Sequence, residues 1–227
     1  MFGLDGWIAH FSDGTTAVMV ALVAIVLGLR HATDPDHLAA VTTLIASERD
    51  RAARAAGRLG LTWGLGHATS LFAFGLPIVL FRAYLPETIQ RAAEASVGFV
   101  IVALAVWLLV RWHRGVFHVH AHPHPATRSP LQAYGIGLVH GMGGSAGVGV
   151  LLLASIHDHT TAVVALALFA FFTAASMAML STGFGLTLAT RPMSTSLARV
   201  APVLGALSLV FGLWYALGAL DVAPYYF

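Results

Sequence analysis

Six apolar stretches of this sequence are each long enough to cross the hydrocarbon core of a membrane as a helix, which takes about 20 residues. The stretches cover residues 15–45, 59–81, 95–112, 133–156, 162–188 and 200–220. Because the chain has only 227 residues, they leave little length for a water-soluble domain. We therefore predict an all-α, polytopic membrane protein with about six transmembrane helices, which narrows the function to a transporter, a channel or an intramembrane enzyme.

The polar residues are few and of restricted kinds. The chain has no cysteine, which excludes disulfides and thiolate ligands, so any bound metal must be held by nitrogen and oxygen atoms. All 12 basic residues are arginine, and the formal net charge is +2. In a membrane protein the placement of basic residues indicates which side of the membrane each loop faces, rather than an acidic partner. We expect the chain to be embedded in the lipid bilayer and not to bind nucleic acid.

A polar cluster, Arg30-His31-Ala32-Thr33-Asp34-Pro35-Asp36-His37, interrupts the first apolar stretch. Ionisable groups at membrane depth are costly, so this cluster is a functional-site candidate. On a regular helix His31 and His37 would lie about 120° and about 9 Å apart, too far to share one ion. Pro35 removes a backbone donor and predicts a kinked or broken helix, whose ends can fold inward and whose freed carbonyls can serve as ligands.

Imidazole and carboxylate groups without thiolate suit divalent nickel, cobalt, zinc or manganese. His67 and His140 lie in the second and fourth apolar stretches, each beside a glycine, and are the natural additional ligands. Asp34 is either a ligand or a group that orients an imidazole, and Arg30 either neutralises a carboxylate or marks a helix end. The predicted metal site therefore comprises His31, Asp34, Asp36, His37, His67 and His140.

The two halves of the chain resemble each other, with residues 1–112 forming the first half and residues 131–227 the second. A repeat of three spans must have opposite orientations in its two copies, and inverted repeats are typical of transporters that bind substrate near the bilayer midplane. We therefore predict two inverted three-helix repeats. The matching features are Gly28-Leu29-Arg30-His31 with Gly137-Leu138-Val139-His140, Phe74-Gly75-Leu76 with Phe184-Gly185-Leu186, and Gly98 and Trp107 with Gly205 and Trp214.

Arginines concentrate in the connectors that follow the first, third and fifth stretches. The positive-inside rule then predicts that this side is cytoplasmic and that both termini lie outside. The connector at residues 113–130 carries five histidines, at 113, 118, 120, 122 and 124, interrupted by prolines. We expect it to be a cytoplasmic loop that is either a low-affinity metal sink or sensor, or an irregular segment without a metal function.

Residues 30–38, from Arg30 to Leu38, resemble the His-x4-Asp-His signature of the nickel/cobalt transporter (NiCoT) family, whose usual form is close to RHAxDADHI. Leu65-Gly66-His67-Ala68-Thr69-Ser70 resembles the second motif of that family. The resemblance implies a secondary transporter for Ni2+ or Co2+ in a bacterial or archaeal cytoplasmic membrane. It also implies functional roles for His31, Asp34, Asp36, His37 and His67.

Two features depart from the usual family pattern. Typical members have eight spans with the signature in the second, whereas here it lies in the first predicted span. The later family motif, close to LGFDTATE, is absent, and the glycine-rich residues 137–147 stand in its place. This pattern resembles the short urease-accessory-type relatives of the family.

Together these features predict a permease with Ni2+ or Co2+ as its substrate and with no cofactor. The family resemblance alone favours uptake, and a cytoplasmic histidine-rich loop could equally collect metal for export. The sequence contains no phosphate-cradling glycine loop, so we expect the membrane potential or proton exchange to drive transport. The sequence does not decide whether the chain contacts a second copy of itself or a metallochaperone. Two alternatives remain: an intramembrane enzyme that uses His31 and Asp36 as an acyltransferase-type His-x4-Asp pair, and a metal-binding accessory subunit of a larger assembly.

Overall fold

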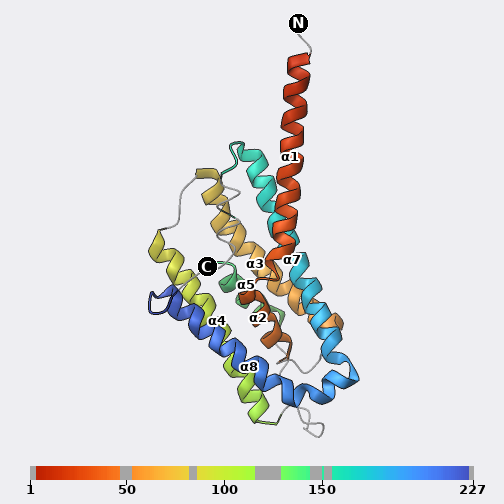
Figure 1. The fold of residues 1–227 in the computed structure, drawn as a ribbon, viewed down its shortest axis with the longest axis vertical. Helices are drawn as coiled ribbons and strands as arrows, with labels where there is room; N and C mark the ends of the chain where they lie inside the picture. The colour runs from red at the N-terminus through yellow and green to blue at the C-terminus, as the bar shows by residue number, and fades with distance from the viewer. Residues whose placement is uncertain are drawn as a thin grey trace.

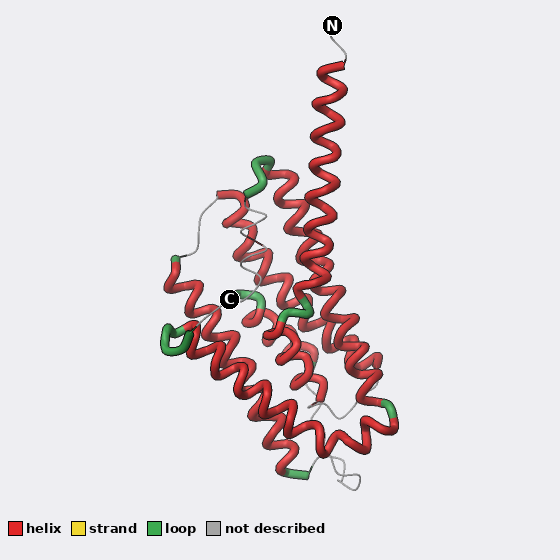
Figure 2. Tube along the Cα trace, in the orientation of Figure 1, coloured by secondary structure: helices red, strands yellow, loops and turns green. Residues whose placement is uncertain are grey.

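The described part of the chain is helical throughout and contains no strand, which confirms the predicted all-α class for these residues (Figures 1 and 2). This computed structural model describes residues 4–46, 53–81, 86–115, 129–143, 150 and 155–224. Most of the histidine-rich loop predicted at residues 113–130 therefore lies outside the described residues. The helices are α1 (Leu4–His31), α2 (Pro35–Ala46), α3 (Ala53–Phe81), α4 (Glu87–His113), α5 (Pro130–His140), α7 (His159–Ala189) and α8 (Arg191–Ala219).

Four helices in the described residues are long and apolar enough to cross a membrane: Arg54–Phe81, Glu87–His113, His159–Leu188 and Ala198–Ala219. A fifth span results if Ala17–His31 and Pro35–Ala46 are counted together as one bent span. The predicted fourth span, residues 133–156, is not one unbroken helix, because α5 ends at His140 and Gly141 caps it. Residues 144–149 and 151–154 of this stretch lie outside the described residues. Glycine is a common residue at helix ends, and this stretch contains several.

The first apolar stretch is broken, as the sequence predicted. Helix α1 ends at His31, α2 begins at Pro35, and the two helices are bent by 47°. In the turn between them, the backbone N–H groups of Thr33 and Asp34 donate to the carbonyls of Arg30 and His31, at 2.8 and 3.1 Å. Proline suits the first position of a helix, where no N–H is needed. Pro35 thus starts the second helix rather than kinking a single one.

Two glycines let α1 and α5 approach a neighbouring helix in the same way. Helix α1 packs against α7, where a Cβ added at Gly28 would lie 2.6 Å from the Phe169 carbonyl oxygen and 3.1 Å from the Thr173 nitrogen. Helix α5 packs against α3, where a Cβ at Gly137 would collide with the Trp63 carbonyl oxygen and lie 2.9 Å from the nitrogen of His67. Each glycine precedes its helix-ending histidine by three residues.

The same two interfaces each contain one serine hydrogen bond between helices. The Ser70 hydroxyl of α3 donates to the Leu138 carbonyl of α5, and the Ser176 hydroxyl of α7 donates to the Leu29 carbonyl of α1, both at 2.8 Å. Leu29 and Leu138 each follow one of the two glycines directly.

We expect Ser70→Ala and Ser176→Ala to lower the free energy of unfolding by similar amounts, about 0.6 kcal/mol each, the mean for such bonds between membrane helices. Denaturant unfolding of the detergent-solubilised protein would measure both. A loss at one serine several times larger than at the other would show that the two interfaces are not equivalent.

Helices α4 and α8 pack together as an antiparallel pair along one side of the molecule (Figure 1). Near one end of the pair, a Cβ at Gly98 would lie 2.8 Å from the Cα of Ala216. Near the other end, a Cβ at Gly205 would lie 2.8 Å from the Cγ of Leu109. Near this second end, the Trp112 indole N–H of α4 also donates a hydrogen bond to the Ala198 carbonyl of α8, at 2.7 Å.

Candidate metal site

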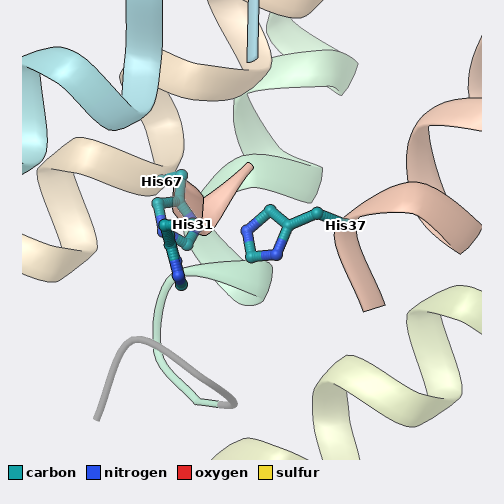
Figure 3. A group of neighbouring side chains, drawn as sticks. All are labelled: His31, His37 and His67. Atoms are coloured by element: carbon teal, nitrogen blue, oxygen red, sulfur yellow. The ribbon is translucent and has the colours of Figure 1, made fainter. Parts of the chain in front are cut away.

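The structure brings all six predicted site residues into the interior of the helix assembly, where each is at most 7% exposed. They come from four helices and one break: His31 ends α1, Asp34 lies in the break, Asp36 and His37 lie in the first turn of α2, His67 is in α3 and His140 ends α5. The break in the first span contributes to this, since His37 at the start of α2 places its ring against His67 of α3 and His140 of α5. Figure 3 shows the His37 ring directed towards the rings of His31 and His67.

His31, His37 and His67 form one group with the spacing of metal ligands. The Nε2 atoms of His31 and His67 are 3.1 Å apart, and the His37 ring centroid is 4.5 and 5.0 Å from those of His31 and His67. One candidate ligand atom from each residue lies within 4.8 Å of the others. Imidazole nitrogens bind first-row metals at about 2.1 Å, so opposed ligands lie about 4.2 Å apart and small side-chain movements would close this group on an ion.

Asp36, His37 and His140 form a second group with the same spacing. The two carboxylate oxygens of Asp36 lie 3.2 Å from His37 Nδ1 and 3.4 Å from His140 Nε2. The ring centroids of His37 and His140 are 4.5 Å apart. His37 therefore belongs to both groups, and the second contains a carboxylate where the first has only imidazoles.

Asp34 belongs to neither group. One of its oxygens lies 3.1 Å from His31 Nδ1 and the other 3.4 Å from an Arg30 guanidinium nitrogen. Because the carboxylate contacts the Nδ1 side of His31, the Nε2 atom of that ring faces His67. Of the two roles that the sequence left open, this geometry favours the orienting one, as carboxylates commonly do behind metal-binding histidines.

Several polar atoms of the cluster are buried without a hydrogen-bond partner in the described residues. They are His37 Nε2, His67 Nδ1 and His140 Nδ1, while Asp36 Oδ2 and His140 Nε2 have only each other, at 3.4 Å. Leaving such atoms unsatisfied costs free energy, and their concentration in one place requires an explanation. A bound cation would satisfy lone pairs of this kind, because carboxylate oxygens and neutral imidazole nitrogens are electron-pair donors.

Trp63 was not among the predicted site residues, yet its ring lies 5.7 Å from that of His37 and 5.6 Å from that of His140. Phe169 of α7 lies 5.5 Å from the His31 ring in a comparable way. Trp63 precedes His67 by four residues, which places both on one helix face, and that spacing was the available signal. Both aromatic rings are buried beside the imidazoles.

The acyltransferase-type pair considered as an alternative is not favoured by the geometry. His31 contacts Asp34 rather than Asp36, and Asp36 instead contacts His37 and His140. A carboxylate that orients a histidine base must contact that histidine directly, so the His-x4-Asp spacing does not correspond to a catalytic pair here.

Two characterised proteins are similar to this chain. It is 26% identical over 216 residues to the urease accessory protein UreH of Bacillus sp. (strain TB-90), covering 89% of this chain and 92% of UreH. It is 34% identical over 136 residues to the high-affinity nickel transport protein of Cupriavidus necator, covering 59% of this chain and 36% of that protein. No family model and no solved structure matches the chain. These relatives are transport and accessory proteins rather than enzymes, and they support a role in metal transport.

Proposed function

We propose that this chain, which is similar to a urease accessory protein and to a nickel transport protein, is a permease for Ni2+ or Co2+ in a prokaryotic cytoplasmic membrane. The observation that supports this most directly is the buried cluster of four histidines and Asp36, drawn from helices far apart in sequence. Burying so many ionisable groups among apolar helices is costly, and a transported cation offsets that cost.

We assign the ligand roles to His31, Asp36, His37, His67 and His140, with Asp34 orienting His31. Nitrogen ligands with one carboxylate suit late first-row divalent metals, and the general affinity order places nickel above cobalt. The name of the C. necator relative agrees with nickel as the substrate. Metal leaves such a site readily when the imidazoles are protonated, which fits coupling to protons.

We propose further that residues 1–112 and 131–227 are inverted repeats of each other, joined by the loop at 113–130. The glycine contacts and serine hydrogen bonds support this, because α1 relates to α7 as α5 relates to α3. In the α4–α8 pair, Gly98 lies against Ala216 and Gly205 lies against Leu109. Gly98 and Gly205 are 107 residues apart, and so are Leu109 and Ala216, as expected if each pair occupies equivalent positions in the two repeats. A twofold axis that relates antiparallel helices is perpendicular to them, so it would lie in the membrane plane.

On this architecture five of the six proposed spans lie in the described residues: the α1–α2 pair, α3, α4, α7 and α8. The sixth, predicted over residues 133–156, lies partly outside the described residues. The arginine distribution supports an orientation with both termini outside and the histidine-rich loop in the cytoplasm. We propose uptake as the direction, on the resemblance of residues 30–38 to the signature of the nickel/cobalt transporter family.

Reconstitution of the purified chain alone into liposomes tests the proposed function. We expect flux of Ni2+ or Co2+ well above that of empty vesicles and above that of Mn2+, with Zn2+ measured alongside. Imposed proton and potential gradients would identify the driving force.

The UreH relative makes the accessory-subunit role the second candidate. Stoichiometric binding of metal without any flux from the purified chain would favour that role. Absence of both binding and flux would remove the metal hypothesis altogether.

A further inference from the structure

The two ligand groups share one residue, which bears on how an ion passes through the site. His37 is common to the group with His31 and His67 and to the group with Asp36 and His140. This inference rests on the proposed transport function. The question is whether the groups are one site, two independent sites or two stations of the same ion.

His37 lies between two histidines that occupy equivalent places in the two halves. His31 ends α1 and His140 ends α5, each three residues after its close-packed glycine. The His37 ring is 4.5 Å from each of the two rings. An aromatic ring also flanks each histidine at nearly the same distance, Phe169 at 5.5 Å from His31 and Trp63 at 5.6 Å from His140.

The ligands other than His31, His37 and His140 have no equivalent in the other half, so the two groups differ chemically. Where α3 provides His67, the corresponding position of α7 holds Thr173, whose buried hydroxyl has no hydrogen-bond partner in the described residues. The group on the His140 side includes Asp36 instead. One group therefore offers three imidazoles, and the other offers two imidazoles and a carboxylate.

We propose that a single ion occupies the two groups in succession, first one and then the other, with His37 bound to it throughout. Under the inverted twofold axis, His31 and His140 lie on opposite sides of the midplane, so the two stations face opposite sides of the membrane. Simultaneous occupancy is disfavoured because two divalent cations on one imidazole repel strongly at low dielectric. Retaining one ligand during the transfer avoids full dehydration of the ion at membrane depth.

Cobalt binding and X-ray absorption at the cobalt edge test this with the purified full chain. We expect one Co2+ per chain in the wild type. Because His67 and His140 each belong to only one group, His67→Asn should hold Co2+ with two imidazoles and His140→Asn with three. Each variant should still bind Co2+ but transport it at least about tenfold more slowly in liposomes, because each lacks one of the two groups that the ion must occupy in turn and the barrier to transfer rises.

Asp36→Asn provides a second variant of the same station and should behave as His140→Asn does. His159→Asn, at the exposed start of α7, is the matched control and should keep wild-type binding and flux. Elution of each variant as a single species in size-exclusion chromatography would establish that it is folded.

Three results would overturn the inference without overturning the proposed function. Two Co2+ ions per wild-type chain would indicate independent sites, and three imidazoles in both single variants would indicate one site built from all four histidines. Wild-type flux in His140→Asn would show that the second station is not used, while leaving the proposed function intact. A wild-type chain that neither binds nor transports Co2+ would instead overturn the proposed function for cobalt, and the inference with it.

Discussion

Replacing His37 by asparagine is expected to reduce metal flux to the level of empty vesicles. His37 is the one residue common to both ligand groups, so its loss leaves each group with only two of its three members. We expect the affinity for Ni2+ or Co2+ to fall at least about a hundredfold, equivalent to about 2.7 kcal/mol. Equilibrium dialysis would measure the affinity, and uptake into liposomes would measure the flux.

His159→Asn is the matched control for this variant, because it removes an exposed histidine at the start of α7, outside both groups. Asparagine at position 37 keeps a polar group beside Asp36, which limits the cost of removing the imidazole. A folded His37→Asn protein that carries metal at the wild-type rate would show that the ion does not pass through this cluster.

Replacing Gly137 by alanine is expected to destabilise the protein and to displace the site. The added methyl group would meet the backbone of Trp63 and His67, which cannot move aside as a flexible side chain could. Overpacking of this kind costs about 1–3 kcal/mol. Because α5 would be pushed away from α3, His140 would shift relative to the other ligands, so we expect weaker metal binding as well as a lower apparent melting temperature in detergent.

Gly135→Ala, on the same helix, is the matched control, since a Cβ at Gly135 has no neighbour within 4 Å. Alanine favours a helix over glycine by up to about 1 kcal/mol, so this variant should be as stable as the wild type or more so. Equal melting temperatures for the two alanine variants would contradict the close approach of α5 to α3.

The sequence was most informative where a residue has a strong local effect or a high cost of burial. Pro35 predicted the break in the first span, because a proline inside a helix removes a donor and clashes with the preceding turn. The carboxylates and histidines at 31–37 stood out because charge is rare at membrane depth. His67 and His140 were found by the same argument, and the structure places both beside His37.

The packing of the helices could not be predicted from the pattern of apolar residues. Helices α4 and α7 are apolar on nearly all sides, so no stripe of hydrophobic residues marks the face that contacts a neighbour. Trp63 of α3 was missed because an aromatic residue in an apolar helix is unremarkable by itself, and only its spacing of four residues from His67 marks it. The end of α5 at His140 was also missed, although Gly141, Gly143 and Gly144 follow it directly.

The termination of α1 and α5 at histidines has an electrostatic consequence for the cluster. Aligned peptide dipoles place roughly half a negative charge at the C-terminal end of a helix. Two such ends, at His31 and His140, converge on the same buried imidazoles. The N-terminal end of α2, which begins at Pro35 beside the same cluster, opposes them with about half a positive charge, so roughly half a negative charge remains. The backbone thus supplies a net negative potential of its own, which favours cations even with Asp34 and Asp36 neutralised.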